Sequence, residues 1–150
     1  MRWHKTDVSQ YVEAKEYIDS AVIPLISLDF SLDIEKNAAQ NEILEILASQ
    51  LERELTGRLM LVPSYYYIKT GNREVEISRL NNWVEHIKTQ PFRHVFFLTF
   101  DSAWKKEEQA LQGSLIWLPG IQSGEINSKE MQGMVREQVV QIGELIRSYW

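Results

Sequence analysis

The segment 94–100, His-Val-Phe-Phe-Leu-Thr-Phe, constrains the fold more than any other part of the sequence. It is a nearly continuous run of β-branched and aromatic residues with no alternation of polar and apolar positions. A strand of this kind has both faces covered, which is typical of a parallel sheet between two layers of helices. Three further apolar runs predict strands of the same type: 24–28, 59–62 and 114–118.

The segments between these runs have helical periodicity. We expect helices over 37–55, over 75–87 and from an N-cap at Asn127 to about Tyr149, a first helix after an N-cap at Asp7, and a short amphipathic piece over 102–111. Residues 65–68 continue the second strand after a break at Pro63. The sequence therefore predicts an α/β fold: a three-layer open sheet of about four mostly parallel strands with helices on both faces. The connection to the last strand is only about 13 residues long, so either direction is open for it.

Composition places the chain in one globular domain, residues 1–150. It holds 150 residues, 44% of them hydrophobic, and carries a formal net charge of -5. The absence of cysteine excludes disulfides, thiolate catalysis and cysteine-ligated metals. The first ten residues do not resemble an export signal, and no apolar run approaches the roughly 20 residues of a membrane span, so we expect a cytoplasmic protein without a membrane contact.

Charge gives no indication of a nucleic-acid partner. Arg58, Lys69 and Arg73 flank three consecutive tyrosines, a combination that can bind single-stranded nucleic acid. Three cations in an acidic protein would release few counterions, and a strand with solvated flanks explains the same residues. We therefore expect no nucleic acid among the partners.

Searches for catalytic motifs leave one enzymatic hypothesis. The turn after the first strand contains no glycine for a dinucleotide fingerprint, no P-loop is present, and the three histidines are scattered. Asp29 and Asp101 follow strands, and Asp33 comes four residues after Asp29, so three carboxylates could meet at one edge of the sheet and hold Mg²⁺ for phosphoryl or nucleotide chemistry. The competing interpretation is that Asp29 ends a strand and that Asp33 and Asp101 cap helices. No metal or other cofactor is expected under this second interpretation.

Aromatic residues suggest a different role. Trp104 and Trp150 lie in polar or terminal settings and, with Tyr66, form a candidate surface for a protein partner or a homodimer. The alternative is that the two tryptophans fold back over helix ends. In a strand over 65–68, Tyr65 and Tyr67 would share one side and Tyr66 the other.

Several segments resemble the YpiF-like family, small uncharacterised proteins of Gram-positive, endospore-forming bacteria. The resemblance covers nearly the whole chain and is carried by residues 1–3, 11–17, 21–26, 51–54, 57–64, 77–80, 95–99 and 115–119. It implies a single bacterial domain but supplies no activity and no catalytic residues. The leading expectation is thus a non-enzymatic cytoplasmic interaction or accessory domain, and the alternative is a metal-assisted phosphoryl or nucleotide-handling enzyme.

Overall fold

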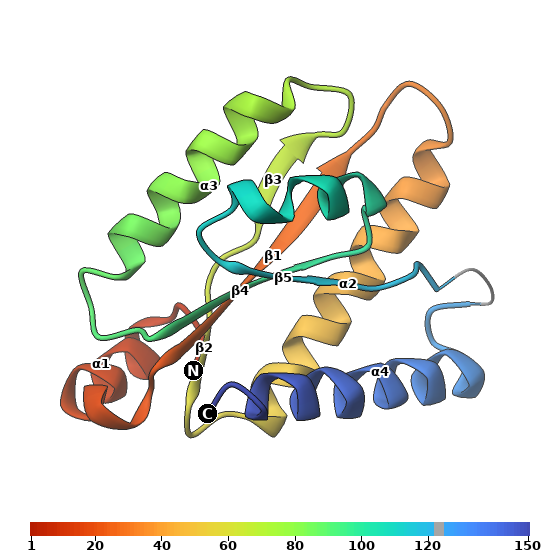
Figure 1. Ribbon diagram of the computed structural model, residues 1–150. Helices are drawn as coiled ribbons and strands as arrows, with labels where there is room; N and C mark the ends of the chain where they lie inside the picture. Colours follow the sequence, from red (N-terminus) through yellow and green to blue (C-terminus); the bar gives the residue numbers. More distant parts are fainter. Residues whose placement is uncertain (122–124) are drawn as a thin grey trace.

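The computed structural model describes residues 1–121 and 125–150. Helices and strands alternate along most of the chain, as the periodicity predicted (Figure 1). The elements are α1 (Lys5–Glu13), η1 (Lys15–Tyr17), β1 (Ser20–Leu28), α2 (Ile34–Glu54), β2 (Leu59–Leu61), β3 (Tyr65–Ile68), α3 (Arg73–Ile87), β4 (His94–Thr99), η2 (Ser102–Ala110), β5 (Ser114–Trp117) and α4 (Lys129–Arg147). None of the described helices is long and apolar enough to cross a membrane.

All pairings in the five-stranded sheet are parallel. The strand order is β2-β1-β4-β5, and β3 pairs with the same edge of β1 as β2 does. β2 lies beside the first part of β1 and β3 beside its last part, so together they form the interrupted second strand that the sequence predicted. Pro63 accounts for the interruption because it lacks the backbone N–H that a continuous ladder needs. The direction of the last strand, which the sequence left open, is parallel.

Two hydrophobic clusters lie on opposite faces of the sheet. Alternate residues of β1 point to each face: Val22 and Ile26 pack under α2 and α4, whereas Ile23 and Leu25 belong to the cluster covered by α1, α3 and η2. Figure 1 shows α2 and α4 on one side of the strands and α1 and α3 on the other. The predicted three-layer α/β fold is therefore confirmed.

Helix starts differ from the predictions by one to three residues. α1 begins at Lys5 and has no side-chain cap; Asp7 lies in its first turn and accepts a hydrogen bond from the Arg2 N–H instead. α2 begins three residues earlier than predicted because Asp33 caps it. α4 is capped by Ser128, which accepts from the Met131 N–H, one residue after the predicted cap. At α2 and α4 the difference arises because more than one polar residue near the start is a competent cap.

Candidate ligand-binding crevice

The strand order places a crevice at the carboxyl ends of β1 and β4. The chain leaves β1 for β2 and β3 on one side, through α2, and reaches β4 on the other side through α3. In open parallel sheets, such a reversal of direction leaves an open space beyond the strand ends, where ligands bind. A cavity of about 370 Å³ lies at this point, and its lining residues are mostly polar. They include Ser27, Asp29, Asp33, Lys36, Asn37, Gln40, Asn41, Lys69, Thr99 and Asp101.

Side-chain amides of α2 form one wall of the crevice. Asn37 accepts a hydrogen bond from the Asp29 N–H at 3.2 Å and donates to Ser27 Oγ at 3.3 Å. Asn41 donates to the Ser27 carbonyl at 2.5 Å. Gln40 donates to the Ile121 carbonyl, and its buried Oε1 has no hydrogen-bond partner in the described part of the chain. The bonded amides hold the first turns of α2 to the end of β1, and Gln40 Oε1 accepts no hydrogen bond from residues 1–121 or 125–150.

Asp29 and Asp33 take part in local backbone structure. Asp29 closes the turn after β1 by accepting from the Ser31 N–H at 3.0 Å and from the Ser31 hydroxyl at 2.5 Å. These bonds, together with the nearby Lys69 ammonium, lower the pKa of Asp29 below its ordinary value. Asp33 accepts from the Lys36 N–H at 3.0 Å and caps α2. Both carboxylates are therefore held in fixed positions at the rim.

Asp101 is the most enclosed of the three carboxylates, with 8% of its side chain exposed. Its Oδ1 caps η2 by accepting from the Ala103 N–H at 3.0 Å, and its Oδ2 accepts from the Tyr67 hydroxyl at 2.7 Å. The Arg73 guanidinium lies 3.7 Å from Oδ2 and covers the Trp104 ring at 4.3 Å. Asp101 thus connects the crevice to a buried polar network under η2.

The structure brings the three predicted carboxylates to one cavity but does not arrange them as a metal centre. Among residues 1–121 and 125–150, no three histidine, aspartate or glutamate side chains lie close enough together to hold a metal ion. The capping interpretation is confirmed for Asp33 and Asp101. Asp29 ends the strand, as the same interpretation predicted, and closes the turn that follows.

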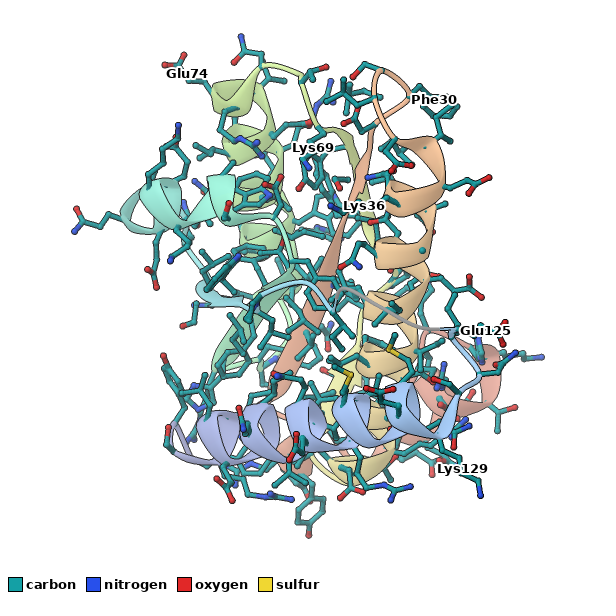
Figure 2. The ribbon with its side chains drawn as sticks, turned by 90° about the vertical axis from the view of Figure 1, so that its right-hand side faces the viewer. Phe30, Lys36, Lys69, Glu74, Glu125 and Lys129 are labelled. Carbon is teal, nitrogen blue, oxygen red and sulfur yellow. The ribbon has the colours of Figure 1, made fainter. Side chains whose placement is uncertain are left out.

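Two lysines complete the crevice, and neither was predicted from the sequence as a residue of this site. Lys36 comes from the first turn of α2 and Lys69 directly follows β3; neither forms an ion pair within 4.0 Å in the described structure. Figure 2 shows both at the same end of the molecule as Phe30, far from Lys129. Lys36 follows the cap of α2 and Lys69 follows β3. Both places lie at the carboxyl edge of the sheet, so these positions could have indicated the site.

Comparison with known proteins agrees with the resemblance seen in the sequence. Residues 9–150 match the family described as "Protein of unknown function (DUF2487)". The chain belongs to this family. It is 32% identical to the "Uncharacterized protein YpiF" of Bacillus subtilis (strain 168) over 150 residues, which cover 100% of this chain and 98% of that protein. No solved structure matches the chain.

The aromatic residues predicted to form an interaction surface have three different environments in this DUF2487 protein. Trp104 is fully buried, so its prediction as an exposed anchor was wrong. The amphipathic η2 turns the ring inward, where Nε1 donates to the Tyr67 hydroxyl at 2.9 Å. Trp150 is partly buried, donates to Ser20 Oγ at 2.8 Å and lies under the Arg58 guanidinium. Tyr66 is 58% exposed, and its hydroxyl donates to Glu45 at 3.0 Å.

The cations that flank the tyrosines do not form one basic surface in this DUF2487 protein. Arg58 donates two hydrogen bonds to Asp19, at 3.0 and 3.1 Å. Arg73 is turned toward Asp101 and Trp104, and 19% of its side chain is exposed. Lys69 remains, and it belongs to the crevice.

Proposed function

We propose that the crevice at the carboxyl ends of β1 and β4 binds a small phosphate-bearing ligand of the nucleotide class. The observation that carries this proposal is the position of Lys36 and Lys69 in a cavity at the reversal point of the sheet, without ion pairs in the described part of the chain. An ammonium group without a carboxylate partner attracts an anion and donates up to three hydrogen bonds to it. The cavity volume of about 370 Å³ falls in the usual range for small-molecule sites.

The remaining lining supplies groups for the rest of such a ligand. Gln40 Oε1 is a buried acceptor without a partner in the described residues, and Thr99 lies at the end of β4. An unsatisfied buried acceptor gains free energy when a ligand N–H or O–H reaches it. Leu32 and Leu44 provide apolar surface for a base or another flat group. Recognition would then combine two charges, one amide oxygen and an apolar wall.

The proposed role is binding rather than catalysis. Asp33 and Asp101, two of the three carboxylates, cap helices, and Asp29 closes a turn. Mg²⁺ often enters sites of this kind with the phosphates of its ligand and needs only one or two protein carboxylates. Asp29 is the candidate for that contact, and it keeps the metal-assisted alternative open to test. We place the domain in the cytoplasm, where phosphorylated metabolites are concentrated.

Thermal unfolding in the presence of inorganic phosphate, AMP and ATP, each with and without Mg²⁺, tests the proposal. A ligand at a hundred times its dissociation constant adds about 2.7 kcal/mol to the free energy of unfolding. We expect stabilisation of the natural protein and its loss in a Lys36→Ala, Lys69→Ala variant. Lys129→Ala is the control, because Lys129 is an exposed lysine at the start of α4. The proposal would be contradicted if none of these compounds stabilised the natural protein. It would also be contradicted if they stabilised the Lys36→Ala, Lys69→Ala variant as much as the Lys129→Ala control.

A second candidate function is protein interaction through the turn after β1. Phe30, Leu32 and Ile34 are 76%, 84% and 52% exposed, three large apolar side chains within five residues. Clustered exposed apolar residues mark interaction sites more often than isolated ones do. Replacement of Phe30 and Leu32 by serine should abolish the capture of a partner from cell extract and leave unfolding of the free protein unchanged. Capture that persists in this variant would contradict this role for the turn.

A further inference from the structure

The outer edge of β3 is open, whereas the adjoining edge of β2 is covered. Next to β2, the Leu61 N–H donates to the Met1 carbonyl at 2.8 Å, and Arg2 forms a parallel bridge with Leu61. β3 pairs with β1 on one side, and none of the described residues pairs with its other side. The N-terminal residues therefore close half of this edge of the sheet and leave the other half available.

The backbone of β3 presents hydrogen-bonding groups to solvent along this edge. The Lys69 N–H points inward, since it donates to the Leu28 carbonyl at 2.9 Å. Because successive N–H groups of a strand point to opposite edges, those of Tyr66 and Ile68 point outward. Natural sheets usually protect such an edge with lysine, proline or a bulge. The strand Tyr-Tyr-Tyr-Ile contains no charge and no proline.

The side chains on the exposed positions of this strand are also apolar or aromatic. Tyr66 is 58% exposed and Ile68 is 55% exposed, whereas Tyr65 and Tyr67 point into the core. Glu45 of α2 accepts from the Tyr66 hydroxyl, so α2 borders the same face.

We propose that β3 pairs with β3 of a second copy of this chain, antiparallel and around a two-fold axis. This inference is independent of the ligand proposed for the crevice. In the register that places Tyr67 opposite its own counterpart, Tyr66 of each copy faces Ile68 of the other. The outward N–H groups of these residues then donate across the axis, and an aromatic side chain meets a β-branched one.

Self-complementarity is the argument for a second copy as the occupant. A two-fold axis brings identical surfaces together, so a suitable edge must carry no like charges at opposing positions. β3 satisfies this condition because its four residues are uncharged.

Light scattering and sedimentation equilibrium over a concentration series test the proposal. We expect the natural chain to form a dimer and Ile68→Lys to be a monomer, since the lysine would face Tyr66 of the second copy. Val140→Lys is the matched control, because Val140 is 54% exposed on α4, and it should remain a dimer. A monomeric natural chain would overturn the proposal, as would an Ile68→Lys variant that dimerises like the control. Circular dichroism of each variant verifies that it is folded.

Disulfide trapping tests the register, since the natural sequence contains no cysteine. Tyr66→Cys and Ile68→Cys variants are prepared separately, mixed and oxidised. Residues in a hydrogen-bonded antiparallel pair have Cα atoms about 5.5 Å apart, within reach of a disulfide. We expect a strong cross-linked dimer only in the mixture. Equal cross-linking of either variant alone, or of a Val140→Cys control, would overturn this register. Pairing of β3 with a strand of another protein, in place of β3 of a second copy, would overturn the dimer itself.

Discussion

The Tyr67 hydroxyl donates a 2.7 Å hydrogen bond to Asp101. This bond connects β3 to the segment that directly follows β4, across the end of β1. The same hydroxyl accepts from Trp104 Nε1, so one oxygen links three segments that are distant in sequence. Burial, followed by the charge and hydrogen bond of Asp101, raises the pKa of Tyr67. The tyrosine is therefore a neutral donor that holds one wall of the crevice in place.

Tyr67→Phe should destabilise the fold. The substitution removes the donor to Asp101 and the acceptor for Trp104, and it leaves both polar groups buried without that partner. Each such loss costs about 1–3 kcal/mol, so we expect a decrease of at least about 1 kcal/mol in the free energy of unfolding. Urea titration measures it. Tyr66→Phe is the control, because its hydroxyl bonds to Glu45 at the surface, and it should change stability by less than about 0.5 kcal/mol. Equal losses in the two variants would mean that the buried network contributes nothing beyond an exposed hydrogen bond.

Stability should fall at alkaline pH through Tyr65. Burial and the hydrogen bond to Glu76 raise the pKa of Tyr65 to about 12. A pKa above the unfolded value of about 10 means that the stabilisation is complete below pH 10 and is lost as the pH rises toward 12. Urea titrations between those values measure the slope. Tyr65→Phe should reduce the slope, and a slope that stays the same would show that other groups cause the alkaline loss.

Much of the fold was predictable from local patterns. The apolar run at 94–100 has both faces buried, as its lack of alternation predicted, and Pro63 separates β2 from β3 as expected. These features depend on burial periodicity and on the missing N–H of proline, both of which are properties of short segments. The parallel direction of β5 was not predictable, because a connection of about 13 residues fits either direction and only the packing of η2 against the sheet decides.

The candidate site was only partly predictable, for a related reason. Asp29 and Asp101 each follow a predicted strand, which placed both at the carboxyl edge of the sheet. Both line the crevice there. Lys36 and Lys69 have the same kind of position but no motif spacing. Trp104 was misplaced because its neighbours in sequence are charged, whereas its burial depends on Tyr67, 37 residues away. Contacts of this range leave no mark on local composition.

The ion pair of Asp19 and Arg58 should make the free energy of unfolding depend on pH in the acidic range. Burial opposes ionisation of Asp19, but the hydrogen bonds and charge of Arg58 outweigh it and lower the pKa of Asp19 below 3.8. With a folded pKa below the unfolded one, the stabilisation is present above about pH 4 and is lost as the pH falls through the folded value. Asp19→Asn should therefore lower stability at neutral pH and flatten the acid limb of a urea-midpoint series. An unchanged acid limb would assign acid unfolding to other carboxylates, such as Glu52, whose pKa is also lowered.

Two glycines should respond in opposite directions to replacement by alanine. At Gly113, a Cβ atom would lie 2.7 Å from Cε2 of Phe97 and 3.0 Å from the Val95 carbonyl oxygen, and Phe97 is fully buried in the core. Neither neighbour can move freely, so Gly113→Ala should cost about 1–3 kcal/mol, the usual range for overpacking. Gly133 lies inside α4 with no atom within 4 Å of its Cβ position. Gly133→Ala should therefore stabilise the protein by up to about 1 kcal/mol, through the higher helix propensity of alanine. Urea titration of the two variants measures the sign of each change. A stabilising Gly113→Ala would contradict the close approach of Gly113 to Phe97 and Val95 of β4.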